Sequence, residues 1–172
     1  MEDQVTLVDE NDKEVGVEEK MAAHRSGKLH RAFSVFIFDS SGRLLLQKRA
    51  LAKYHSGGLW SNTCCGHPRP NENRHDAARR RLKEEMGIDC ELTEMFSFVY
   101  RADLSSGLIE HEYDYVFFGS HDGEPVPNPE EVEDWKWMDM GQLRADVQRN
   151  PHLYTFWLAE CLDRVIAHSR ST

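Results

Sequence analysis

The stretch from Trp60 to Ile88 constrains the fold more than any other, because a loop rich in glycine and proline passes directly into a charged helix. Ala78, Leu82 and Met86 recur every fourth residue while basic and acidic side chains take the other faces, which predicts an amphipathic helix. Gly87 then ends it. Opposite charges four residues apart along this helix indicate a solvated face and do not by themselves indicate chemistry.

Strand-like runs surround this stretch. The run A-F-S-V-F-I-F over residues 32–38 is rich in β-branched and aromatic residues, and the turn D-S-S-G separates it from R-L-L-L-Q-K-R over residues 43–49. Together they predict a central, largely buried hairpin. A short hairpin is expected over residues 5–17, and further strands over residues 92–100, 108–118 and 135–138.

Helices and loops connect these strands. One or two helical turns are expected over residues 18–24, and residues 50–61 lack periodicity, which is typical of a loop at a functional site. The acidic residues 121–133 contain three prolines and predict a connection. Four-residue spacing predicts an amphipathic helix over residues 151–168, carrying Leu153, Trp157, Cys161 and Val165. Strands interleaved with a few helices predict one α/β or α+β domain over residues 1–172.

Charge and cysteine content restrict the partners. The net charge of -9 argues against a nucleic-acid partner or an anionic membrane surface, so any phosphate on a ligand must meet local cations. No run of about eighteen apolar residues predicts a membrane span. The amino-terminal residues carry no basic, apolar export signal, so we expect a cytoplasmic protein with free thiols at Cys64, Cys65, Cys90 and Cys161. Cys64 is expected to fill the core.

Pairs of polar residues could form a metal site. Two carboxylates lie two apart on a predicted strand and therefore leave the same face, and a cysteine and a histidine share that spacing. Three imidazoles and two carboxylates would suit Mn²⁺ or Zn²⁺ better than Mg²⁺, which prefers oxygen ligands. Hydrogen-bonded or surface roles explain each residue as simply, so both interpretations stay open. The pairs are Glu110 with Glu112, Cys65 with His67, and His24 with His30.

Aromatic residues suggest a second possibility. Trp60, Tyr100 and Trp157 lie near predicted loops or on a predicted helix, and an aromatic pocket can hold a cationic group over its ring faces. Core packing explains these residues equally well.

Residues 66–88 resemble the Nudix box, G-x5-E-x7-R-E-U-x-E-E-x-G-U, in which U is apolar. One position departs, because Arg81 replaces the first glutamate of R-E-U-x-E-E, a carboxylate that helps to hold catalytic Mg²⁺ in the family's hydrolases. Its loss argues against ordinary diphosphate hydrolysis, which needs metal ions to activate water. The box matches at Gly66, Glu72, Arg80, Leu82, Glu84, Glu85, Gly87 and Ile88.

Four further motifs give a narrower resemblance. N-T-C-C-G-H-P, H-R-S-G-K-L-H-R-A-F, F-V-Y-R-A and G-L-I-E-H-E together resemble the type 1 isopentenyl diphosphate isomerases, a Nudix-fold family that does not hydrolyse its substrate. The similarity runs from about Val5 to Trp157. It implies a Nudix-type mixed β-sheet sandwiched between helices. It also implies interconversion of isopentenyl and dimethylallyl diphosphate through a carbocation, in isoprenoid precursor synthesis.

The resemblance also implies residue roles. Metal ligands would be His24, His30, His67, Glu110 and Glu112, binding Mn²⁺, Zn²⁺ or Mg²⁺. Cys65 and Glu112 would be the catalytic groups, and Glu85 would bind a Mg²⁺ that bridges to the diphosphate. Basic positions around the diphosphate would be Lys20, Arg49, Lys53 and Arg81. For this chemistry, Trp157 is our candidate to face the cation and Tyr100 to hydrogen-bond Glu112 and relay its proton.

Two other functions are open on the residues alone. The chain could be a Nudix diphosphatase acting on a nucleotide-like substrate, which Arg81 disfavours. It could also be a non-catalytic metal-binding domain, which would need neither the Cys65 thiol nor the basic cluster. We expect a monomer with a small-molecule diphosphate substrate.

Overall fold

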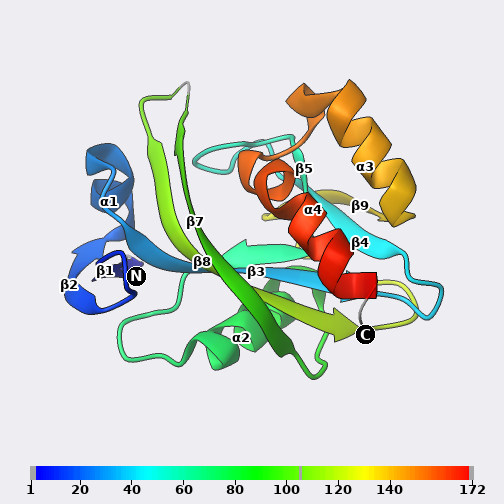
Figure 1. The fold of residues 1–172 in the computed structure, drawn as a ribbon, viewed down its shortest axis with the longest axis horizontal. Coiled ribbons are helices and arrows are strands. Elements are labelled where there is room, and N and C mark those ends of the chain that lie inside the picture. Colours follow the sequence, from blue (N-terminus) through cyan, green and yellow to red (C-terminus); the bar gives the residue numbers. More distant parts are fainter. Residues whose placement is uncertain (1–2, 105, 171–172) are drawn as a thin grey trace.

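A mixed β-sheet of nine strands crosses the described part of the molecule, and helices cover both of its faces (Figure 1). The computed structural model describes residues 3–104 and 106–170. The ends of the expected domain, residues 1–2 and 171–172, and residue 105 lie outside this part. The predicted α+β class, with the sheet between helices, is confirmed.

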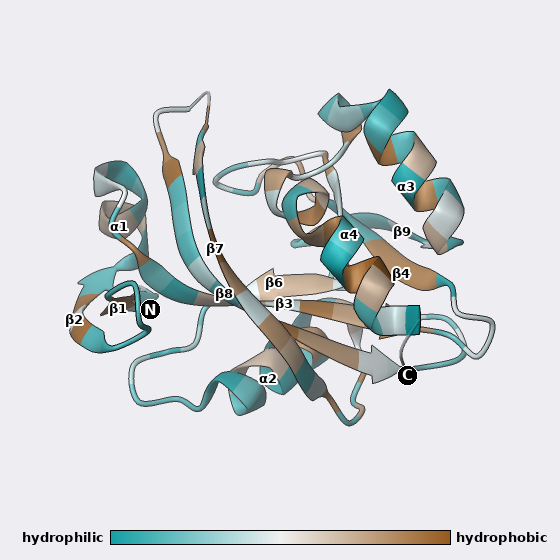
Figure 2. Cartoon of the chain, in the orientation of Figure 1, coloured by the Kyte–Doolittle hydropathy of each residue, from teal (hydrophilic) through white to brown (hydrophobic). Residues whose placement is uncertain are grey.

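The central strand β3 (His30–Phe38) contributes to two apolar cores, because successive side chains of a strand point to opposite faces. Phe33, Val35 and Ile37 pack with α2 (Arg74–Met86). Phe36 lies in the core that contains residues of α3 (Met140–Arg149) and α4 (Phe156–Arg170). Apolar residues accordingly gather along the central strands and on the inner side of α4 (Figure 2).

Strand pairing brings together segments that are distant in the sequence. β3 pairs in parallel with β8 (Ile109–Ser120), placing His30 opposite Glu112. On its other edge, β3 pairs with the short strand β6 (Cys64–Gly66), placing Ser34 opposite Cys65. The antiparallel partner of β8 is β7 (Thr93–Asp103). The polar residues of β6 and those of β8 thus lie on opposite sides of β3.

The predicted central hairpin forms, but its strands diverge. β3 and β4 (Leu44–Arg49) pair beside the turn, at Phe38 and Leu44. Beyond the turn, β4 pairs instead with β5 (Trp60–Ser61) and β9 (Val132–Met138), because β6 and β8 occupy the edges of β3. The amino-terminal hairpin of β1 (Gln4–Val8) and β2 (Glu14–Glu19) is as predicted.

Local capping signals set the helix ends. The side chain of Asn73 caps α2, and Gly87 ends it in the left-handed conformation with φ 66°, as predicted. α1 (Lys20–Ser26) begins two residues later than expected, because Glu19 accepts hydrogen bonds from the first helical N–H groups.

The carboxyl-terminal part differs from the prediction. Residues Pro151–Leu153 form a separate 3₁₀ turn, η1, and Leu153 is exposed, whereas Trp157, Cys161 and Val165 are buried on α4. α3 was not predicted, although Leu143 and Val147 give it a buried side at four-residue spacing.

The cysteines are free, as predicted, and Cys64 is fully buried in the core. Within the part of the chain that is described, no helix is both long and apolar enough to cross a membrane.

Candidate functional site

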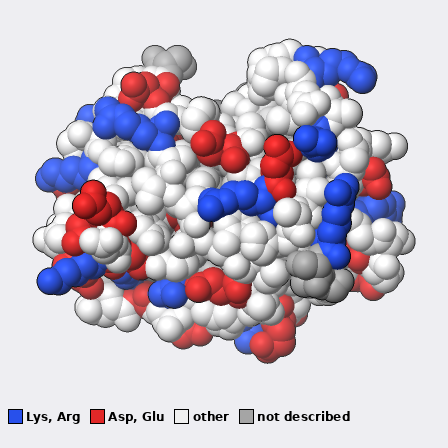
Figure 3. All heavy atoms as spheres, in the orientation of Figure 1, with Lys and Arg blue, Asp and Glu red and all other residues white. Residues whose placement is uncertain are grey.

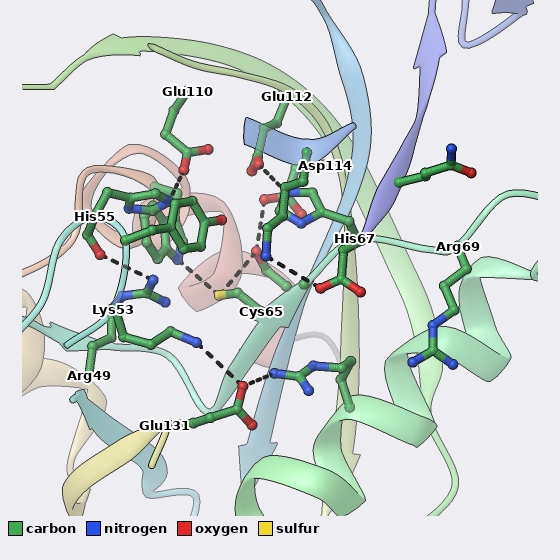
Figure 4. A pocket seen from close by; sticks show the side chains of 18 of the residues that line it. Arg49, Lys53, His55, Cys65, His67, Arg69, Glu110, Glu112, Asp114 and Glu131 are labelled. Atoms are coloured by element: carbon green, nitrogen blue, oxygen red, sulfur yellow. Dashed lines mark hydrogen bonds and ion pairs between the residues drawn. The ribbon is translucent and has the colours of Figure 1, made fainter. Parts of the chain in front are cut away.

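A pocket of about 140 Å³ opens where the loop after β4 meets β6 and β8 (Figure 4). Five of the residues singled out from the sequence do not line it: His24, His30, Glu85 and Tyr100 are buried, and Trp60 is partly buried against an apolar core. The others line the pocket together: Lys20, Arg49, Lys53, Cys65, His67, Arg81, Glu110, Glu112 and Trp157.

Three imidazoles converge on Glu112, which lies beside His30 because of the β3–β8 register. The Nε2 atoms of His30 and His67 lie 3.1 Å and 2.8 Å from Glu112 Oε2. The donor atoms of His24, His30, His67 and Glu112 all lie within 4.8 Å of one another. This spacing suits a single metal ion.

Backbone carbonyls orient two of these rings. His24 Nδ1 lies 2.7 Å from the carbonyl oxygen of Lys20, and His30 Nδ1 lies 2.9 Å from that of Lys28. Because a carbonyl can only accept, each Nδ1 carries the proton, and in the neutral ring the lone pair is on Nε2. Such outer hydrogen bonds are typical of metal-binding histidines.

The protonation states of His67 and Glu112 also fit a divalent metal. His24 Nε2 is buried and makes no hydrogen bond, so a cation would satisfy its lone pair. Burial lowers the pKa of His67 to about 4, which keeps the ring neutral. Burial would raise the pKa of Glu112, but the imidazoles of His30 and His67 beside it hold this pKa well below its usual range. Neutral imidazole and ionised carboxylate are the forms that bind metals.

Glu110 and Glu112 leave the same face of β8, as predicted. Glu110 Oε1 turns toward two histidines, lying 3.5 Å from His24 Nε2 and in contact with Nε2 of His55. The predicted hydrogen bond from Tyr100 to Glu112 Oε1 is present at 2.5 Å, and the same hydroxyl lies 3.3 Å from Glu110 Oε2. Tyr100 therefore fixes both carboxylates.

Cys65 presents a protonated thiol. Its Sγ donates to Asn62 Oδ1 at 3.1 Å and lies 3.0 Å from the indole N–H of Trp157. Burial raises the pKa of this thiol to about 12. Trp157 thus directs its N–H edge at Cys65, and the Arg49 guanidinium lies 5.2 Å from its ring centre.

Basic side chains gather on one side of the pocket. Arg81 pairs with Glu85 Oε2 and with Glu131 Oε1, both at 2.5 Å, and Lys53 lies 3.5 Å from the same Glu131 oxygen. Nε of Arg49 is buried and has no hydrogen-bond partner. An anionic ligand could therefore replace a carboxylate and satisfy a free donor. Elsewhere, on the face shown in Figure 3, basic and acidic side chains are interspersed.

Several lining residues were not predicted, among them His55, Asp114 and Glu131. Asp114 continues the two-residue spacing of Glu110 and Glu112 along β8, so the signal was present in the sequence. It accepts a 2.8 Å hydrogen bond from Ser34, and burial raises its pKa well above the usual range. Glu131 and His55 lie in irregular segments, where periodicity gives no guidance.

Known proteins are similar to this chain in sequence and in fold. The NUDIX domain family matches residues 28–158. Isopentenyl-diphosphate Delta-isomerase 1 of Aromatoleum aromaticum is 71% identical over 167 residues, covering 97% of this chain and 94% of that protein. Isopentenyl-diphosphate Delta-isomerase of Burkholderia multivorans is 53% identical over 164 residues, covering 95% and 93%.

A solved structure supports the fold alone. DR0079 from Deinococcus radiodurans superimposes with a TM-score of 0.80 at 21% identity, covering 94% of this chain and 98% of that one. The altered box, the clustered histidines and carboxylates, and relatives matched over nearly the whole chain agree. The chain therefore belongs to the type 1 isopentenyl diphosphate isomerases of the Nudix superfamily.

Proposed function

We propose that the chain interconverts isopentenyl diphosphate and dimethylallyl diphosphate, which agrees with relatives that are named isopentenyl-diphosphate Delta-isomerase. The observation that carries this proposal is a single pocket lined by a thiol, an ionised carboxylate and several cations. Arg81 at the altered box position supports isomerisation over hydrolysis, because it supplies a cation where hydrolases place a metal-binding carboxylate.

The reaction moves a double bond by adding one proton and removing another. A proton adds to the terminal methylene carbon, and positive charge develops on the neighbouring tertiary carbon. A proton then leaves the adjacent carbon on the diphosphate side. Cys65 and Glu112 are the two groups that exchange these protons, and they swap roles when the reaction runs backwards. Both line the pocket into which the hydrocarbon part would enter.

The carbocation needs an electron-rich, dry surrounding. Trp157 is 4% exposed and lines the same pocket, so its indole can stabilise positive charge while excluding water. Tyr100 holds Glu112 through its 2.5 Å hydrogen bond and relays its proton. These two residues act beside the proton-exchanging pair.

Metal ions would hold the carboxylate and the diphosphate. His24, His30, His67, Glu110 and Glu112 would bind Mn²⁺ or Zn²⁺, which suit mixed imidazole and carboxylate donors better than Mg²⁺ does. When bound, this ion keeps Glu112 ionised and oriented. Glu85 would bind Mg²⁺ bridging to the diphosphate, while Lys20, Arg49, Lys53 and Arg81 bind its oxygens. We further place the enzyme in the cytoplasm as a monomer, in isoprenoid precursor synthesis.

One assay separates the possible functions. The purified protein is incubated with isopentenyl diphosphate and Mg²⁺, and the products are analysed for dimethylallyl diphosphate and for released phosphate. We expect the isomer without phosphate. Phosphate release would instead support a hydrolase, and neither product would support a non-catalytic metal-binding domain.

A further inference from the structure

His55 is a buried histidine that lies outside the five predicted metal ligands. It is 6% exposed and belongs to the loop between β4 and β5. The loop is held there because Arg49 Nη2 donates a 3.3 Å hydrogen bond to the carbonyl oxygen of His55. The ring also packs edge-on against Trp157, with ring centres 5.7 Å apart. His55 is thus fixed in place at the pocket wall.

The ring of His55 points at Glu110, as Figure 4 shows. Its Nε2 contacts Glu110 Oε1, and the donor atoms of His24, His55 and Glu110 lie within 4.8 Å of one another. His55 Nδ1 lies 3.0 Å from Ser56 Oγ. When Nδ1 donates to that hydroxyl, the lone pair of Nε2 faces Glu110, which repeats the arrangement of His24 and His30.

Two groups of possible ligands meet at His24. One contains His30, His67 and Glu112, and the other contains His55 and Glu110. All of these side chains are buried except His67, which is partly buried. The shared Nε2 of His24 has no hydrogen-bond partner, so an ion bound there lies next to both groups. Without His55, the two groups supply five ligand atoms; with it, they supply six.

We propose that His55 is a fourth imidazole ligand of the metal centre, which then takes all six of its ligands from the protein. Each of the four histidines and two glutamates offers one ligand atom, in two groups that share His24, and an ion beside His24 would draw the two groups together. Six ligands complete the octahedral shell that Mn²⁺ adopts. Glu110 and His55 enter the shell together, because their ligand atoms are adjacent and a bound cation would satisfy the lone pairs of both.

A complete shell has a chemical consequence, which rests on the proposed isomerase function. Structural metal sites are closed by protein ligands, whereas hydrolytic sites keep one position open for water. A carbocation in the adjacent pocket must be kept from water. His55 therefore converts an open coordination site into a closed one, suited to holding Glu112 and unsuited to hydrolysis.

Counting the coordinated imidazoles tests the proposal without substrate. Full-length protein containing ¹⁵N-labelled histidine is loaded with Mn²⁺ alone, and nitrogen couplings to the ion are counted by pulsed electron–nuclear double resonance. We expect four imidazoles in the wild-type protein and three in His55→Gln, with Mn²⁺ affinity lowered about tenfold or more. His75→Gln, which removes an imidazole from α2 outside the cluster, should leave the count at four.

Affinity alone would not decide the question, because a residue that only orients Glu110 would also affect it. Three imidazoles in the wild-type protein, absence of bound Mn²⁺, or an unchanged count in His55→Gln would overturn the proposal. The wild-type count stands even where the variant folds poorly. Since no substrate is present, this result is independent of the isomerisation assay, which can fail or succeed separately.

Discussion

At the scale of single residues, the pocket combines groups whose protonation states are complementary. The Cys65 thiol keeps its proton because it is buried, with a pKa of about 12, while neighbouring imidazoles hold the pKa of Glu112 well below its usual range. One group can donate a proton where the other can accept one. Alkene isomerisation needs both capacities within a single site.

Cys65→Ala and Glu112→Gln should each lower kcat about 10²- to 10⁴-fold, because each removes one proton-exchanging group. Both variants should keep the fold, which circular dichroism would verify, although Glu112→Gln should also lower the Tm because it removes a proposed metal ligand. Cys90→Ala removes a thiol outside the pocket and serves as the matched control with unchanged kcat. Substantial turnover in either variant would remove that residue from the mechanism.

Arg81→Gln should raise KM about 10- to 100-fold, because it removes a charged donor worth about 1.5–3 kcal/mol to the diphosphate. The box-restoring Arg81→Glu should do at least as much, since it adds a carboxylate beside Glu85 and Glu131. Steady-state kinetics would separate KM from kcat. Arg79→Gln, on the exposed side of the same helix, is the control. Unaltered kinetics in both Arg81 variants would contradict its role.

At the scale of elements, the loop after β8 joins the box helix to the pocket. Val126 and Asn128 donate hydrogen bonds to the carbonyls of Met86 and Glu85, at the end of α2. Further along, the loop supplies Glu131 to Arg81. The loop after β8 therefore satisfies carbonyl groups at the end of α2 and also places a carboxylate beside a basic residue of the pocket.

Gly87→Ala should destabilise the protein by about 3 kcal/mol. Gly87 has φ 66°, and an added Cβ would lie 2.7 Å from the Val126 carbonyl oxygen. Gly42 has φ 80° with nothing within 4 Å of an added Cβ, so Gly42→Ala should cost only about 1 kcal/mol, from backbone strain. Urea unfolding would measure both free energies. Equal losses of unfolding free energy in the two variants would show that the loop containing Val126 can move away from the added methyl group at no cost.

Glu72→Gln should weaken the attachment of the loop that precedes α2, in which Glu72 lies, to the helix itself. The Arg80 hydrogen bonds outweigh burial and lower the pKa of Glu72 below its ordinary value of 4.5. A lowered folded-state pKa means that this stabilisation is present above pH 4.5 and is lost on acidification through the folded pKa. At pH 7 we expect a loss of about 1 kcal/mol, because the pair is partly exposed.

Urea unfolding of the wild type and Glu72→Gln between pH 7 and pH 3 would measure that difference, which should shrink as the pH falls. A constant difference across this range would show that the carboxylate charge contributes nothing.

Local signals made the box helix predictable, whereas non-local pairing did not follow from the sequence. Asn73 and Gly87 mark the ends of α2 within the helix's own neighbourhood. Glu112 lies beside His30 only because of the parallel β3–β8 register, which joins residues 82 apart in the chain. The spacing of residues within each strand does not specify that register. The family resemblance supplied those ligands instead. His55 was not predicted, because an irregular loop has no hydrophobic periodicity from which the direction of its side chains could be inferred.

At the scale of the whole molecule, the proposed metal ligands connect segments that lie far apart in the sequence. His24 comes from α1, His30 from β3, His67 from the residue after β6, and both glutamates from β8. An ion bound to all of them fastens the amino-terminal segment to the central sheet. In the unfolded chain these ligands are dispersed, so the ion favours the folded state.

Metal removal should therefore lower the Tm of the whole protein. An ion at 100 times its Kd stabilises by about 2.7 kcal/mol, which corresponds to about 5–10 °C for a chain of this size. Calorimetry with saturating Mn²⁺ or with a chelator would measure the shift. Glu110→Gln should reduce it, while His111→Gln, one residue along β8 on the opposite side, should retain it. Equal Tm values with ion and with chelator would mean that the cluster does not bind the ion selectively in the folded state.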